Sequence, residues 1–152
     1  MKVMKKIAFT VFLILAFSCG REKTEYRFDF DKVGWKKFDN LKFSVDNFDP
    51  DKLYGISLEL LFDENYKVKT FDFQLLIDNN DGESWNKIFS LKVRDREGKL
   101  KGEKTRDNKY RFVSTLVKRK YFHEKARYDF TIVNLNPKII TEGIYSLALK
   151  IQ

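Results

Sequence analysis

The chain has 152 residues, of which 43% are hydrophobic and 16% aromatic, and its formal net charge is +8 at pH 7. This length suits one domain with a sizeable core and excludes an arrangement of two. Three lysines lie within the first six residues, so the rest of the chain carries a net charge of only about +5, which does not favour a nucleic-acid partner.

Residues 1–18 have the layout of a bacterial export signal. The cationic start (Lys2, Lys5 and Lys6) is followed by an apolar run over residues 7–17. This run is too short to span a bilayer permanently. We therefore expect residues 1–18 to be cleaved as a signal peptide.

The residue that follows this signal, Cys19, is the only cysteine of the chain. The small residues Ala16 and Ser18 stand three positions and one position before it, as at a cleavage site. A thiol at this place can take a diacylglyceryl group and become an acylated N-terminus, and two acyl chains suffice for stable anchoring. We predict a lipoprotein signal with Cys19 as the lipidation site, palmitate among the acyl groups, and residues 19–25 as a tether. The alternative is an ordinary cleaved signal with an unmodified cysteine beside it.

From residue 26 onward, apolar residues alternate with polar ones at a period of two, which is typical of strands with one buried face. Eight segments show the pattern, around residues 28–30, 41–45, 56–62, 71–77, 89–93, 110–112, 128–132 and 145–151. Strands with one apolar face must pack sheet against sheet or close into a barrel. We predict an all-β domain over residues 26–152: a single antiparallel β-sandwich of about eight strands, immunoglobulin-like or jelly-roll-like.

The connections between these segments carry turn signals. Residues 78–82 (DNNDG) predict a hairpin turn with Gly82 at positive φ, and residues 96–99 (REGK) predict a second one. The polar stretch 99–109 is either a mobile loop or a polar edge hairpin. Helix is expected for a turn or two at most, around residues 49–52.

The sequence offers little for catalysis or metal binding. His123 is the only histidine, and it lies in a charged stretch without a nucleophile motif. The acids of residues 78–83 approximate a calcium loop but lack its later glutamate, so turn-forming acids are the better interpretation. We expect no metal site, no catalytic residue and no cofactor other than the covalent lipid on Cys19.

Two features remain as candidate contact sites. Trp35 and Trp85 lie outside the strongest alternation. They either cap the ends of the core, which we favour, or are exposed and stack on a sugar or anchor a partner protein. The basic run 118–120 (KRK) is read as a solvated loop, and the alternative is contact with lipid headgroups or an acidic partner.

Five stretches carry a resemblance to a known family: YRFDFDKVGWKKFDNLKFSVD (26–46), YGISLELLFDENYKVKTFDFQLLI (54–77), FSLKVRDREGKLKGEK (89–104), YFHEKARYDFTIVN (121–134) and IITEGIYSLALKI (139–151). In them the chain resembles the gliding-motility lipoprotein H family of Bacteroidota, the GldH-type lipoproteins, which have a lipoprotein signal, a brief tether and one β-rich domain.

The resemblance implies a non-enzymatic lipoprotein of the cell envelope. It implies an accessory or structural role in surface gliding and in the type IX secretion apparatus coupled to it. The expected partners are membrane lipid, through acylated Cys19, and other envelope gliding or secretion proteins. The alternative is a lipid-anchored glycan- or protein-binding module that uses Trp35 or Trp85; an envelope hydrolase is a more distant third.

Overall fold

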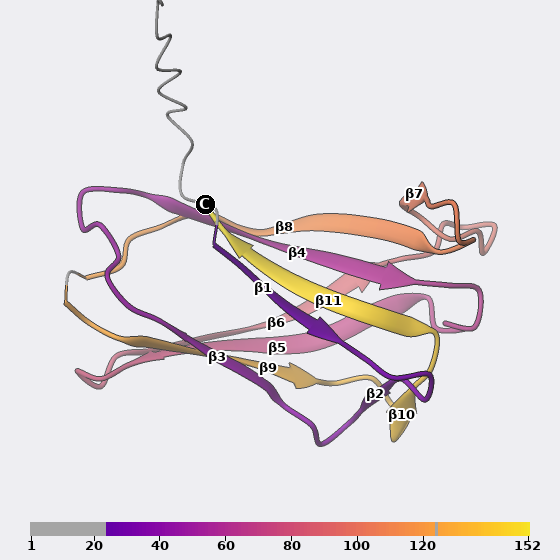
Figure 1. Ribbon diagram of the computed structural model, residues 1–152, viewed down its shortest axis with the longest axis horizontal. Coiled ribbons are helices and arrows are strands. Elements are labelled where there is room, and N and C mark those ends of the chain that lie inside the picture. The colour runs from indigo at the N-terminus through magenta and orange to yellow at the C-terminus, as the bar shows by residue number, and fades with distance from the viewer. Residues whose placement is uncertain (1–23, 124) are drawn as a thin grey trace, which may run out of the picture.

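The computed structural model describes residues 24–123 and 125–152. These residues form two antiparallel sheets that face each other, with a two-stranded ribbon toward one end (Figure 1). The predicted all-β sandwich is therefore confirmed. Helices are absent from the described ranges, so none there is long and apolar enough to cross a membrane.

The first sheet has the strand order β1-β11-β4-β8-β7, the second has the order β3-β9-β5-β6, and β10 pairs with β2 in the ribbon. The strands are β1 (Thr24–Asp29), β2 (Trp35–Lys36), β3 (Leu41–Val45), β4 (Tyr54–Phe62), β5 (Thr70–Asn79), β6 (Ser84–Lys92), β7 (Glu103–Lys104), β8 (Tyr110–Lys120), β9 (Tyr128–Asn134), β10 (Ile140–Thr141) and β11 (Ile144–Ile151).

Eight of the described strands have five or more residues, and they coincide with the eight alternating segments of the sequence. The chain passes to the other sheet after each of these long strands except β5, which forms a hairpin with β6. The resulting order, with β1-β11-β4-β8 facing β3-β9-β5-β6, is that of a jelly roll. Of the two predicted sandwich types, the chain thus adopts the jelly roll.

The alternation of apolar and polar residues determines which face of each sheet is buried. On β5, Phe71, Phe73 and Leu75 are each 0% exposed, whereas the residues between them are only partly buried. Leu58 and Leu60 of β4 are 0% and 1% exposed on the facing sheet. Each such side chain stabilises the fold by about 1.5–3 kcal/mol through its removal from water. The core lies between the two sheets.

Aromatic rings close the sandwich along one side. Tyr26 of β1 stacks on Phe43 of β3 at 3.9 Å between ring centroids, and Phe43 stacks on Phe130 at 4.8 Å. The Tyr26 hydroxyl also donates a hydrogen bond to the Ser44 carbonyl oxygen at 3.4 Å. Since β1 and β3 are edge strands of opposite sheets, these contacts join the two sheets. Among the described residues, no pair of aromatic rings joins β6 to β8 on the other side.

The predicted turns are present at their expected positions. Gly82 has φ 89° and Gly98 has φ 85°, in the region that favours glycine. For residues 99–109 the structure has the polar edge hairpin, because β7 pairs with the start of β8. At residues 49–52, where helix is expected for a turn or two at most, the structure has a single turn. The Lys52 N–H donates to the Asp49 carbonyl oxygen at 3.2 Å before β4 begins.

The outer face of the first sheet holds a largely buried carboxylate. Glu59, on the central strand β4, is 8% exposed. The Lys150 ammonium donates to its Oε2 at 2.6 Å, and Arg27 Nη2 donates to its Oε1 at 3.2 Å. Burial opposes the ionisation of Glu59, but the hydrogen bonds and charges of Lys150 and Arg27 outweigh it and lower the pKa below 4.5.

We predict that Glu59→Gln lowers the free energy of unfolding by about 1–2 kcal/mol at neutral pH, because Lys150 and Arg27 lose their charged partner. A carboxyl group whose pKa is lowered by folding contributes stability above its unfolded value near 4.5, and this stability is lost as the pH falls through the folded pKa. The difference between wild type and variant should therefore shrink below about pH 4 in urea titrations. The control Glu103→Gln, at an exposed position of β7, should change little. A difference that stays constant with pH would contradict this account.

Candidate functional site

The two tryptophans occupy different environments. Trp35 is 1% exposed and stacks on Phe30 at 5.5 Å between ring centroids. Its indole N–H donates to the Asp39 carbonyl oxygen at 2.7 Å, so its one polar atom has a partner inside the protein. The ring of Trp35 is therefore part of the core and offers no open face to a ligand.

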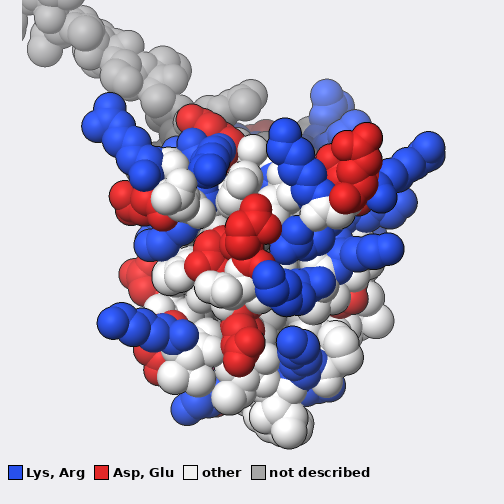
Figure 2. Space-filling view, turned by 90° about the vertical axis from the view of Figure 1, so that its right-hand side faces the viewer, with Lys and Arg blue, Asp and Glu red and all other residues white. Residues whose placement is uncertain are grey.

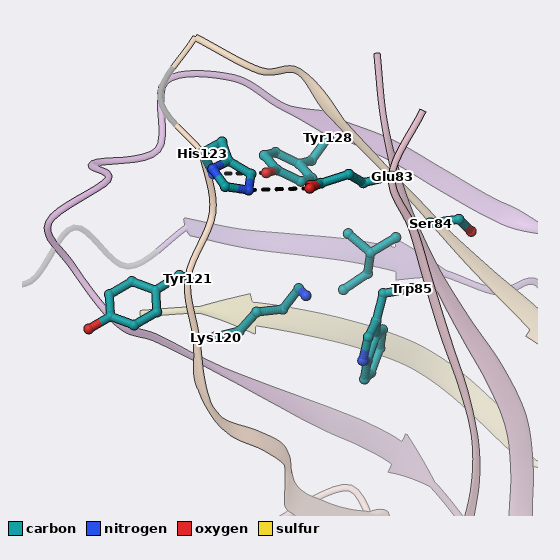
Figure 3. Close-up of a pocket in the computed structure, with 8 residues that line it drawn as sticks. Glu83, Ser84, Trp85, Lys120, Tyr121, His123 and Tyr128 are labelled. Carbon is teal, nitrogen blue, oxygen red and sulfur yellow. Dashed lines mark hydrogen bonds and ion pairs between the residues drawn. The ribbon is translucent and has the colours of Figure 1, made fainter. Parts of the chain in front are cut away.

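Trp85, by contrast, is only partly buried and lines a hollow of about 480 Å³. The hollow lies between the start of β6 and the end of β8, on the side of the sandwich where the described residues form no contact between two aromatic rings. Figure 3 shows Trp85 and Lys120 on facing walls, with the Lys120 ammonium directed toward the indole. The lining residues are Ile77, Glu83, Ser84, Trp85, Lys120, Tyr121, His123 and Tyr128.

The segment after β8 is held in place from the core side. Phe122 is 1% exposed and stacks on Phe48 at 4.0 Å between centroids. The His123 N–H donates to the Tyr128 hydroxyl oxygen at 2.8 Å. Because Phe122 points inward, its neighbours Tyr121 and His123 point outward, and Tyr121 is 63% exposed. In Figure 3, Tyr121 turns away from the other labelled side chains.

Lys120 gives the hollow its positive charge. Its Nζ lies 5.3 Å from the centroid of the Trp85 ring and 5.6 Å from that of Phe122, within the range of cation–π attraction. Burial lowers the pKa of the Lys120 ammonium below its ordinary value, against the attraction of Glu83. Over residues 24–123 and 125–152, no carboxylate forms an ion pair with Lys120. Glu83 instead faces His123, with 3.4 Å between Oε1 and Nε2.

This arrangement is suited to binding. A half-buried ammonium beside an indole face can hold an anionic group attached to an apolar or ring-shaped body. His123 is exposed, and its imidazole faces a carboxylate. Across the described parts of the chain, no three His, Cys, Asp or Glu side chains are grouped closely enough to hold a metal ion.

The sequence singled out Trp85 but not its surroundings. The sequence predicts a solvated basic loop at residues 118–120, whereas Lys120 ends strand β8 and is partly buried; Lys118 and Arg119 are exposed. Trp85 and Lys120 lie on strands of different sheets, and no local pattern brings them together. Cys19, the expected lipidation site, lies outside the described residues.

The fold and the hollow define a single jelly-roll domain with an open, partly apolar hollow between β6 and β8. The chain belongs to the GldH lipoprotein family, whose model matches residues 23–151. This match covers all eleven described strands. Comparison with curated proteins found no match. As a member of this family, the protein is a membrane-anchored lipoprotein of the cell envelope.

We predict opposite outcomes for the two tryptophans in urea unfolding. Trp35→Ala should lower the free energy of unfolding by about 3–5 kcal/mol, because it leaves a cavity in the core. Trp85→Ala should lower it by about 1 kcal/mol or less, because the ring is partly exposed and lies at the wall of an open hollow. Equal losses in the free energy of unfolding would show that Trp85 is packed in the core like Trp35.

Proposed function

We propose that the protein is a lipid-anchored, non-enzymatic component, accessory or structural, of the gliding-motility machinery and the associated type IX secretion apparatus. The observation that carries this proposal is the family match over residues 23–151, which spans the whole folded domain. The lack of a second histidine and of any thiol beyond Cys19 in the sequence supports a role without catalysis.

The proposed anchor is a covalent lipid on Cys19, made free at the N-terminus by cleavage after residue 18. The sequence placed the start of the domain at residue 26, whereas β1 begins at Thr24 and pairs with Ile151 at once. Five residue steps separate Cys19 from Thr24, and a fully extended chain of this length spans at most about 18 Å. The domain therefore stays close to the membrane that holds it, and its partner proteins must meet it there.

We predict that deletion of the gene abolishes the movement of single cells over glass, scored by live imaging. The wild-type gene should restore movement, and a gene for Cys19→Ala should not, because the unlipidated domain is not held at the membrane. Immunoblots must show comparable amounts of both proteins. Normal movement after deletion would overturn the motility role, and rescue by Cys19→Ala would overturn the need for the lipid.

A second candidate function is favoured by the partly exposed ring of Trp85. An indole face at the wall of a hollow can stack on a sugar, as in a glycan-binding module. Such a module should bind isolated glycans on an array and lose this binding in Trp85→Ala. A component of a larger machine should show no binding to isolated glycans and should co-purify with envelope proteins.

A further inference from the structure

The hollow lies at the end of the sandwich where the tether begins. Across the first sheet, Thr24 pairs with Ile151, Ile151 with Ile56, and Ile56 with Val117. Neighbouring strands are about 4.8 Å apart, so this row places Val117, near the end of β8, about 15 Å from Thr24. Lys120 follows Val117 toward the same end, where the C-terminus also lies (Figure 1). The opposite end, shown in Figure 2, carries the β2–β10 ribbon and the β7 hairpin.

The surface around the hollow has the composition of a membrane–water interface. Tyr121 beside it is 63% exposed and Leu53 of the β3–β4 loop is 42% exposed. Exposed cationic side chains lie in the last residues of β8, as Lys118 and Arg119, and in the segment that follows the strand, as Lys125 and Arg127. Aromatic side chains with a polar tip and cationic side chains are the groups enriched where proteins meet lipid headgroups.

The charges at this end are also separated by element. Acidic residues lie on the β3–β4 loop (Asp46, Asp49 and Asp51) and around the β5–β6 turn (Asp78, Asp81 and Glu83), whereas the end of β8 is basic. Near the hollow, Glu83 faces His123, and Asp129 pairs with Arg127 at 3.4 Å. At this end of the sandwich, an anionic surface would therefore attract the region around the end of β8.

We propose that the hollow binds the headgroup of an anionic phospholipid of the membrane that holds the anchor. The Lys120 ammonium pairs with the headgroup phosphate, the Trp85 ring packs against the glycerol part, and Tyr121 lies at the interface. A volume of about 480 Å³ is larger than a phosphate group needs and is within the range of small-molecule sites. Lysine is a common partner of phosphate, which it binds as a point charge.

This inference rests on the proposed anchoring at Cys19, because only an anchored chain is held so near to lipid. Its consequence concerns how the domain is oriented relative to the membrane. A lipid anchor alone leaves the domain free to rotate about its tether, whereas a headgroup contact at the β8 side fixes the face toward the membrane. The opposite end, with exposed Phe38 and Ile139 near the β2–β10 ribbon, is then presented away from the membrane to other envelope proteins.

The test uses the full-length lipidated protein reconstituted in vesicles of phosphatidylcholine, with or without phosphatidylglycerol. Flotation with both kinds of vesicle establishes the anchor first. Quenching of tryptophan emission by acrylamide then reports on Trp85, because Trp35 is buried. We expect the quenching constant to be about two-fold lower with phosphatidylglycerol, since a bound headgroup covers the indole. Lys120→Gln should abolish this protection, and Lys120→Arg should keep it.

Two matched variants distinguish headgroup binding in the hollow from a general attraction between exposed cationic side chains and the anionic vesicle. Lys118→Gln removes an exposed charge from the same strand, and Lys36→Gln removes one from the ribbon. Both should keep the protection by phosphatidylglycerol. Equal quenching in the two kinds of vesicle, protection that survives Lys120→Gln, or equal loss in all three glutamine variants would overturn the proposal. So would the same protection by glycerol phosphate in solution without vesicles, which would identify a free anion as the ligand. Failure to float would instead refute the anchor.

Discussion

The structure depends on the burial of two apolar sheet faces against each other. Each long strand contributes alternate apolar side chains, and neither sheet can keep them from water alone. Phe71, Phe73 and Leu75 on one sheet and Leu58 and Leu60 on the other are fully or almost fully buried. Because the strand order interleaves the sequence, nearly the whole chain must be in place before this core is complete.

The hollow lies where the packing of the two sheets against each other ends, at the end of the sandwich where β1 begins. Stacked rings join β1 to β3 on one side, whereas the described parts of β6 and β8 have no such link. The chain turns inward again at Phe122, which stacks on Phe48, and this contact fixes the backbone on both sides of it. Lys120 is left half-buried beside Trp85. The same stacking that completes the core thus positions the charged group of the site.

The fold class could be predicted from the sequence because a period of two determines which side chains share a face. The turns at Gly82 and Gly98 could also be predicted, since positive φ strongly favours glycine. Strand order could not, because alternation does not say which strand is the neighbour. For the same reason, the approach of Lys120 to Trp85 could not be predicted, because these residues are far apart in the chain and lie on different sheets. The core position favoured for Trp35, by contrast, agrees with its 1% exposure.

The central claim is that a jelly-roll domain is held at a membrane by a lipid on its first mature residue. Mass spectrometry of the N-terminal peptide, released from the protein purified from membranes, tests it most directly. The mature chain should begin at Cys19 and carry a diacylglyceryl group with further acylation. An unmodified Cys19, a chain that begins at another residue, or an uncleaved signal would contradict it.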